Sequence, residues 1–303
     1  LLRQQHGTHD TTRRFVVVTD SAADIADEDL ERLDIHMVPC RLQFGDRGYI
    51  DKVSISAQEF FAELTTNPIH PTTSQPAPGD FRRQFQFLAS HYPDVLSINL
   101  SGAVSGTLEA ARAAAGRANA PGNVHVVDSV NASAGQGLLV VFAAECAAAG
   151  RDVASTMAAV KALIPDTRTF GLLENLDYAV RGGRIPQWAG RLTRLMMATP
   201  IIHTTPGGKV SLSGLFFGKR QRIKRFVRHI MRRVDTTQAL NVAIGYSTNP
   251  DDATALQAEL QQRIPTIQRV CKAELGSALG VHGGPGLLIV STQPVMSTEP
   301  GSD

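Results

Sequence analysis

Cysteine is scarce in this chain of 303 residues, which contains only Cys40, Cys146 and Cys271. Three widely spaced thiols exclude a disulfide framework and a cysteine-based zinc motif, and they favour a reducing, cytoplasmic setting. The net charge is also low, because the 30 Lys and Arg residues are nearly balanced by 28 Asp and Glu residues. The resulting formal charge of +2 argues against a protein built as a whole around nucleic acid.

No apolar run is long enough to span a membrane. The longest, residues 137–150, contains Glu145 and falls short of the roughly 20 residues that a spanning helix needs. Residues 1–13 are polar and lack the apolar core of a secretory signal, so we interpret them as a disordered leader. Residues 292–303 are rich in Ser, Pro and Gly and have the composition of a tail.

Short β-rich runs alternate with helical stretches in the first half, which predicts an α/β fold. Strands are expected at 15–20, 36–44, 94–100 and 123–129. Ser56 and Glu59 form a capping box that opens a helix extending to Leu64. The prolines of residues 70–80 indicate a loop. Further helices are expected at 81–90, directly after 107, at 135–150 and at 153–163.

The pattern begins again after residue 165, which divides the chain into an N-terminal domain (14–165) and a C-terminal domain (166–291). Strands of the second half are expected at 169–174, 200–204, 209–215, 241–247 and 269–275. Helices are expected at 175–182, 187–197, 219–234 and 251–263. Residues 206–208 (PGG) between two apolar runs indicate a hairpin, and a hairpin predicts a mixed sheet.

Polar clusters follow several strands, where open α/β sheets bind ligands. These clusters are Asp20–Ser21, Ser101–Thr107, Asp128–Ser129 and, on the proline-rich loop, Thr72–Ser74. The loop 101–107 (SGAVSGT) presents backbone N–H groups at a strand-to-helix turn, as an anion requires. Two roles remain open for this loop: it binds a ligand anion, or Ser105 or Thr107 simply caps the following helix. The loop matches neither a Walker A sequence nor a dinucleotide fingerprint.

Residues 282–285 (HGGP) are similar to the oxyanion loops of lipases. A hydrolase of that kind needs GxSxG, but Ala103 and Thr107 stand at the glycine positions around Ser105. A structural or solvated side chain is the simpler interpretation of a lone histidine such as His282. The glycines around it favour a backbone that approaches another group closely.

Two basic features have a solvated interpretation and a functional one. Arg181 and Arg184 flank a Gly-Gly pair at the end of an expected helix, where contacts with helix carbonyls or solvent are usual. Residues 219–233 contain eight Lys and Arg and no acid, and their apolar side chains recur on one helical face. The opposite face is either solvated or a docking surface for an acidic partner.

Taken together, these segments resemble the DegV family of fatty-acid-binding proteins, which includes the FakB subunits of bacterial fatty acid kinases. The resemblance extends from about Phe15 to about Val290, and the order of its motifs is specific although each motif alone is weak. The matching segments are VVVTDSAAD (16–24), GYID (48–51), PTTSQPAPGDF (71–81), SGAVSGT (101–107), VHVVDS (124–129), LENLDYAVRGGRI (173–185) and GVHGGPG (280–286).

The resemblance implies a two-domain α/β fold, with an N-terminal Rossmann-like parallel sheet and a mixed C-terminal sheet. It also implies one buried long-chain fatty acid, of the palmitate, stearate or oleate class, and neither a cofactor nor a metal ion. Carried over from the family, Thr73, Ser105 and His282 hold the carboxylate, which suits an anion that only accepts hydrogen bonds. Supporting residues of the same loops are Ser74, Ser101, Gly102 and Gly106.

A partner is implied as well: the carrier presents its ligand to a fatty acid kinase and performs no chemistry itself. Arg184, Lys219 and Arg220 are the expected partner-binding residues, and surface cations of this kind add little to ligand affinity. The chain departs from the family at residues 215–218, where Phe217 replaces an arginine that the kinase-binding members use. This departure concerns the partner and leaves lipid binding unaffected.

Two other functions compete with that of a carrier. An acyl hydrolase would use Ser105 and His282, but the nucleophile elbow and an acid to orient the histidine are missing. A nucleic-acid binder would use residues 219–233, but the low net charge and the lack of a recognised motif disfavour it.

Overall fold

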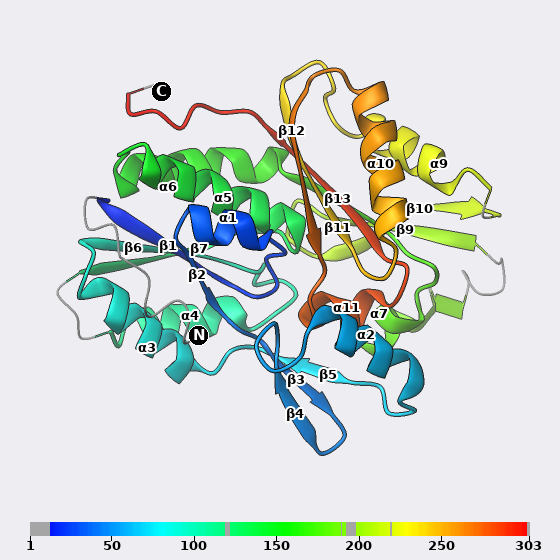
Figure 1. Cartoon of the computed structure of the whole chain (residues 1–303), viewed down its shortest axis with the longest axis horizontal. Helices are drawn as coiled ribbons and strands as arrows, with labels where there is room; N and C mark the ends of the chain where they lie inside the picture. The colour runs from blue at the N-terminus through cyan, green and yellow to red at the C-terminus, as the bar shows by residue number, and fades with distance from the viewer. Residues whose placement is uncertain (1–12, 119–121, 189, 192–197, 219, 302–303) are drawn as a thin grey trace.

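The computed structural model describes residues 13–118, 122–188, 190–191, 198–218 and 220–301. Within these ranges two main sheets stand beside each other, with helices packed between and around them, and a small third sheet completes the fold (Figure 1). Nearly all of the expected leader, residues 1–13, and most of the expected helix at 187–197 lie outside the described residues.

The N-terminal sheet is parallel, as predicted, with strand order β2-β1-β6-β7. Its strands are β1 (Phe15–Asp20), β2 (Ile35–Val38), β6 (Asp94–Asn99) and β7 (Asn123–Asp128). Every residue of β1 is buried, because helices cover both faces of the sheet. The helices are α1 (Asp27–Arg32), α3 (Pro78–Ala89), α4 (Thr107–Ala115), α5 (Ala134–Ala148) and α6 (Val153–Leu163), which leads into the short 3-10 turn η1 (Ile164–Asp166).

The prediction of a single strand at 36–44 is wrong, because the chain leaves β2 at Val38 and enters another sheet. Pro39, which has no N–H to donate to a ladder, stands at the break. The second sheet has the order β4-β3-β5, with strands β3 (Arg41–Phe44), β4 (Arg47–Ile50) and β5 (Thr72–Ser74). Helix α2 (Ala57–Thr66) begins at the predicted capping box of Ser56 and Glu59.

The C-terminal sheet is mixed, as predicted, with the order β10-β9-β8-β13-β11-β12. Its strands are β8 (Arg168–Leu172), β9 (Ala198–Thr204), β10 (Val210–Phe217), β11 (Leu240–Tyr246), β12 (Ile267–Glu274) and β13 (Leu288–Pro294). The expected hairpin joins β9 to β10, and β11 pairs with β12 in parallel. Its helices are α7 (Asp177–Arg181), α9 (Arg222–Met231), α10 (Pro250–Arg263) and α11 (Ser277–Gly283).

Strand β13 and helix α11 have no counterpart among the expected elements, and β13 extends three residues beyond the predicted boundary at 291. The polar sequence Ser291, Thr292 and Gln293 looks like a tail, yet all three side chains are buried. Hydroxyl partners explain the burial of Ser291 and Gln293, since Ser291 Oγ lies 2.8 Å from Thr169 Oγ1 and Gln293 Nε2 donates to Thr167 Oγ1 at 3.2 Å. The Thr292 hydroxyl has no hydrogen-bond partner among the described residues.

Helix α5 connects the two main sheets. It packs against β1 on one side and against β11 and β13 on the other, and nearly all of its residues are buried. A helix that is apolar all round belongs in a core, which explains the long apolar run of the sequence. Within the described part of the chain, no helix has both the length and the apolarity to cross a membrane.

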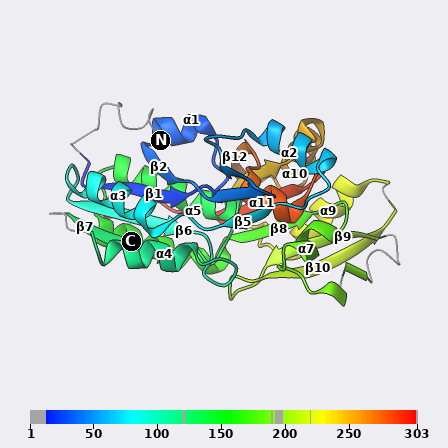
Figure 2. The ribbon, with the colours of Figure 1, turned by 90° about the horizontal axis from the view of Figure 1, so that it is seen from below.

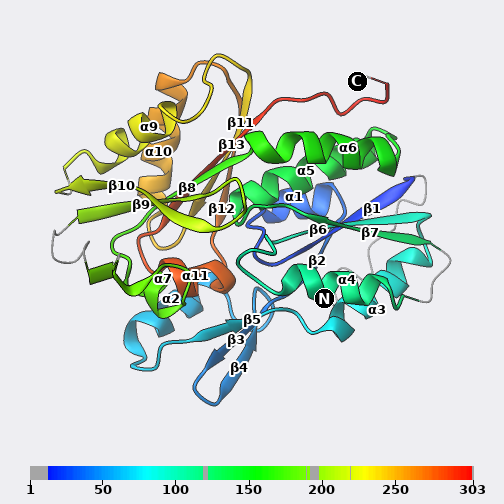
Figure 3. The same cartoon turned by 180° about the vertical axis from the view of Figure 1, so that it is seen from behind.

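Residues 41–74, which comprise β3, β4, α2 and β5 and which we call the arm, reach across to the C-terminal half. Phe60 and Phe61 of α2 cluster with Val281 of α11. Strand β5 also lies beside α11, as Figures 2 and 3 show. The arm therefore belongs to the N-terminal half by sequence but packs on α11, and this brings distant loops into one site.

Candidate functional site

A cavity lies where the two halves meet, between the arm, the loops after β1 and β6, helices α7 and α11, and the β9–β10 hairpin. Its polar lining consists of Thr73, Ser74, Gln75, Ser105, Arg184 and His282. Its apolar lining consists of Ala22, Cys40, Leu100, Val104, Ala132, Ala179, Ile202, Val210, Ala278, Leu279, Leu287 and Ile289. The three residues expected to bind a carboxylate thus line one cavity.

Thr73 and His282 meet directly, with 3.2 Å between Thr73 Oγ1 and His282 Nε2. Thr73 is placed by its pairing with Leu42 in the small sheet, and His282 by the last turn of α11. The contact joins the two halves of the protein. A hydroxyl and an imidazole side by side offer hydrogen bonds without a net charge.

The environment of His282 favours its neutral form. Burial lowers the pKa of His282 to about 3, and the positive charges of Arg184 and His70 act in the same direction. The neutral ring carries one N–H and one acceptor nitrogen. Nδ1 is buried and has no hydrogen-bond partner in the described part of the chain, so no carboxylate there orients the ring as in a hydrolase triad.

Gly182 makes room for the His282 ring. A Cβ atom at residue 182 would lie 2.0 Å from Nδ1 of His282, far inside van der Waals contact. Gly183 differs, because its φ of +73° requires glycine while a Cβ there would meet nothing within 4 Å. The Gly-Gly pair between Arg181 and Arg184 therefore combines a close approach with a left-handed turn.

Ser105 is not the helix cap that the sequence allowed, because Gly106 holds the N-cap position of α4 and no side chain caps it. The Oγ of Ser105 accepts a hydrogen bond from the backbone N–H of Thr107 at 3.2 Å, at the start of α4, and lies 2.8 Å from Thr107 Oγ1. The same side chain lines the cavity. At the neighbouring Gly106, a Cβ would lie 2.0 Å from Gln75 Oε1, so the loop 101–107 closely contacts the residue that follows the arm.

Of the four expected supporting residues, Ser101, Gly102 and Gly106 are not among the described residues that line the cavity. The backbone N–H of Ser101 donates to the Asn131 carbonyl at 2.9 Å, and its buried Oγ accepts from Ala103 at 3.2 Å. Gly102 donates its N–H to the carboxylate of Asp128. These bonds shape the loop, whereas Ser74 lines the cavity directly.

Arg184 occupies the cavity wall, which adds to the partner-binding role expected from the sequence. Its Nη1 donates to the Gly182 carbonyl at 2.5 Å, and partial burial lowers its pKa from the usual value. Among the described residues that line the cavity, it is the one with a formal charge. A ligand anion at Thr73 and His282 would find this cation close by, since Arg184 also acts on the pKa of His282.

The basic region divides into structural and exposed parts, and Lys219 lies outside the described residues. Arg222 is held by ion pairs with Glu174 and Asp252, so it contributes to the fold. Arg220 is exposed. A groove beside α9 is lined by Leu215, Phe216, Phe217, Arg225, Arg228, His229 and Arg232, and 59% of Phe217 is exposed.

Sequence reasoning missed Gln75 and the whole apolar lining. Gln75 belongs to the TTSQP segment, so its position beside Thr73 and Ser74 in the sequence could have indicated that it lines the site. The apolar wall had no such signal, because its residues come from separate elements and look like ordinary core positions. Among the described residues, no group of His, Cys, Asp or Glu is arranged to hold a metal ion.

Comparison with known proteins places these features in a family. Residues 14–294 match the sequence profile of the DegV family, which is described as uncharacterised. A DegV domain-containing protein of Deinococcus radiodurans is 30% identical over 282 residues, which cover 93% of this chain and 99% of that protein.

Solved structures agree with this match. The structure titled as fatty acid binding of a DegV family protein from Thermus thermophilus is 28% identical, with a TM-score of 0.84 over 93% of this chain and all of that one. A stearic-acid-binding protein from Eubacterium ventriosum has a TM-score of 0.82 over 92% of this chain and 98% of that one. At 23% identity, this second likeness concerns the fold alone.

Proposed function

This chain belongs to the DegV family, and on that premise we propose that it binds one long-chain fatty acid in the cavity between its two halves. The carboxylate lies at Thr73, Ser105 and His282, and the acyl chain follows the apolar wall. One observation carries the proposal: the hydrogen-bonding side chains of Thr73, Ser105 and His282 line a single cavity whose other lining residues are mostly apolar. The Thermus relative, described as binding fatty acid, supports it.

The chemistry of the lining suits both ends of such a ligand. Each CH₂ removed from water contributes about 0.8 kcal/mol, so a chain of the palmitate, stearate or oleate class gains most of its affinity from the apolar wall. A carboxylate buried without partners would cost several kcal/mol, which the hydroxyls of Thr73 and Ser105 and the N–H of His282 offset. Arg184, which lines the same cavity, supplies the balancing positive charge.

Mass spectrometry tests this proposal most directly. Lipids are extracted from purified protein, and the intact native mass is compared with the mass after denaturation. We expect one non-covalently bound acid with a chain of 16–18 carbons, retained through purification because its burial opposes release. Protein that carries no acid and does not take up added oleate would overturn the proposal.

We further propose that the bound carboxylate is presented to a fatty acid kinase. The exposed side chains of Arg220, Arg228 and Arg232 provide a positive surface for an acidic partner. Phe217, at the position where the family resemblance implies an arginine, contributes an exposed apolar contact to this surface. Purified kinase, ATP and protein loaded with fatty acid should yield acyl phosphate. If the kinase does not act on the bound acid, the protein binds fatty acid without presenting it to this kinase.

The geometry favours binding over acyl hydrolysis by Ser105 and His282. Ser105 Oγ lies 2.8 Å from Thr107 Oγ1, and Nε2 of His282 is engaged by Thr73. A serine hydrolase needs its nucleophile bonded to the histidine and the histidine oriented by an acid. Within the described residues, no contact joins Ser105 to His282 and no acid bonds to the ring.

A further inference from the structure

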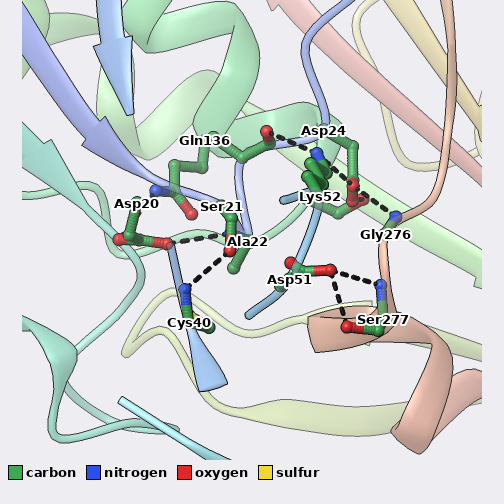
Figure 4. Close-up of polar contacts among 12 residues, drawn as sticks. Asp20, Ser21, Ala22, Asp24, Cys40, Asp51, Lys52, Gln136, Gly276 and Ser277 are labelled. Carbon is green, nitrogen blue, oxygen red and sulfur yellow. Dashed lines mark hydrogen bonds and ion pairs between the residues drawn. The ribbon is translucent and has the colours of Figure 1, made fainter. Parts of the chain in front are cut away.

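Two of the family segments, residues 20–24 (DSAAD) and 48–51 (GYID), supply none of the groups that hold the carboxylate. The carboxylates of Asp24 and Asp51 instead meet the start of α11 in a buried polar cluster, shown in Figure 4. Asp51 Oδ1 accepts hydrogen bonds from the Ser277 backbone N–H at 2.8 Å and from Ser277 Oγ at 2.6 Å. Asp24 Oδ1 accepts from the backbone N–H of Gly276 at 3.0 Å.

The cluster is closely packed. A Cβ at Gly276 would lie 2.6 Å from Lys52 Cε and 3.1 Å from Asp51 Oδ1, so the backbone of α11 touches both side chains. Lys52 has a φ of +60°, an uncommon conformation for a residue with a side chain. Such geometry persists only where surrounding contacts fix it. The start of α11 is therefore held at a defined place on the N-terminal half.

Charges make this arrangement specific. The Asp24 side chain is fully buried, and it pairs with Lys52 Nζ at 3.2 Å and accepts a hydrogen bond from Ser133 Oγ at 2.7 Å. Asp24 and Asp51 thus face one lysine and the amides of α11. A buried carboxylate that lost these partners would be strongly unfavourable, which opposes sliding or rotation of the helix.

Helix α11 transmits this placement to the ligand site. His282 follows Ser277 by five residues, roughly 7.5 Å along a helix that rises 1.5 Å per residue. Between them, Gly280 allows Phe60 to approach so closely that a Cβ would lie 2.4 Å from its ring. The helix is thus fixed at its start by hydrogen bonds to Asp24 and Asp51 and in its middle by contact with the arm. His282 follows at its end, where it contacts Thr73.

We propose that Asp24, Asp51 and Lys52 are positioning residues, which hold α11 so that His282 meets Thr73 in the geometry that binds the ligand carboxylate. The inference rests on the proposed function. It assigns to the DSAAD and GYID segments a role in ligand recognition through α11, without contact with the ligand. It also explains why Ala22 and Ala278, next to the cluster, pack together in the cavity wall.

The test uses the full chain and compares variants at Asp51 and Ser277. Asp51→Ala removes the acceptor, Ser277→Ala removes only the hydroxyl donor, and Asp51→Asn keeps an acceptor oxygen for both bonds. Three quantities are measured: the dissociation constant for oleate, the melting temperature, and the pKa of the His282 ring by ¹⁵N NMR without lipid. A His282→Gln variant assigns the ring signal.

We expect Asp51→Ala and Ser277→Ala to weaken oleate binding at least tenfold and to raise the His282 pKa toward its ordinary value, as the ring becomes more hydrated. Asp51→Asn should restore most of both. The matched control is Asp34→Ala, which removes the acceptor of the Tyr92 hydroxyl and the partner of His36, away from the cavity. It should lower the melting temperature while leaving both oleate affinity and the His282 pKa unchanged.

Opposite results would contradict the role. If Ser277→Ala and Asp51→Ala bind oleate like wild type with an unchanged His282 signal, the cluster only stabilises the fold. Should Asp51→Ala fail to fold, Ser277→Ala and Asp51→Asn decide the matter. Wild-type protein that binds no oleate overturns the proposed function instead, whereas the His282 pKa without lipid still tests the positioning by Asp51 and Ser277.

Discussion

The hydroxyl of Thr73 lies 3.2 Å from Nε2 of His282 although 209 residues separate them in the chain. Thr73 arrives on the arm and His282 on α11, so the pair forms only when the arm packs on the C-terminal half. The geometry of the candidate carboxylate site therefore depends on how the two halves pack against each other. Changes far from the ligand can alter affinity through this contact.

Alanine substitutions of Thr73, Ser105 and His282 test the head-group site. Each should weaken oleate binding by about 1–3 kcal/mol, roughly tenfold or more in Kd, because each removes a hydrogen bond to a buried carboxylate. Isothermal titration with delipidated protein measures the effect. Thr65→Ala is the control, since its hydroxyl bonds only to carbonyls of its own helix. Three variants with wild-type affinity would show that the carboxylate lies elsewhere.

Gly182→Ala tests whether space for the His282 ring limits ligand binding. The new Cβ would lie 2.0 Å from Nδ1, so the ring must move away from Thr73, and we expect at least a tenfold loss of oleate affinity. Gly183→Ala is the matched control next door: its Cβ meets nothing, but its φ of +73° costs about 1–2 kcal/mol of stability. Equal affinities for the two variants would mean that the ring position is unimportant.

Much of this fold could be predicted from local patterns. The strand at 15–20, the capping box at Ser56 and the hairpin after Thr204 follow from apolar runs, hydrogen-bonding pairs and turn residues that neighbour each other in sequence. The candidate carboxylate residues came instead from the family resemblance. Physical reasoning explained why hydroxyls and an imidazole suit the ligand, but it did not select these residues.

The rest depends on tertiary contacts that no local pattern reveals. The run at 36–44 is continuous in hydrophobicity, yet it serves two sheets because the arm begins at residue 41. The end of β13 looked polar because Ser291 and Gln293 find partners only inside the folded sheet. Likewise, the bond between Asp51 and Ser277 spans 226 residues and leaves no sequence signal.

Lys52→Met should destabilise the protein most at neutral pH. Lys52 keeps 26% of its side chain exposed but pairs with the fully buried Asp24, and loss of one partner of such a pair costs about 3–5 kcal/mol. Burial already raises the pKa of Asp24 above 3.8, despite the opposing effect of Lys52. Removing the lysine must raise it further.

The direction of the pH effect follows from proton linkage. A carboxyl whose pKa is higher in the folded state adds stability below 3.8, and this contribution is lost as pH rises through the folded pKa. The deficit of Lys52→Met, measured by urea unfolding, should therefore be smaller at pH 5 than at pH 7. Lys161→Met on the exposed face of α6 is the control. A deficit that is equal at both pH values would exclude an uncompensated buried carboxylate.

Charge reversal at Arg220 and Arg228 tests the docking surface beside Phe217. Both residues lie outside the lining of the lipid cavity, so Arg220→Glu and Arg228→Glu should leave oleate affinity within about twofold of wild type. With a fatty acid kinase, both should slow acyl phosphate formation at low salt, because opposite charges speed the encounter of two proteins. The deficit should shrink as salt screens the charges. Arg82→Glu on α3 is the control, because it changes the net charge by the same amount away from this surface. Equal turnover of all three variants would show that the basic surface beside Phe217 is only solvated and binds no kinase.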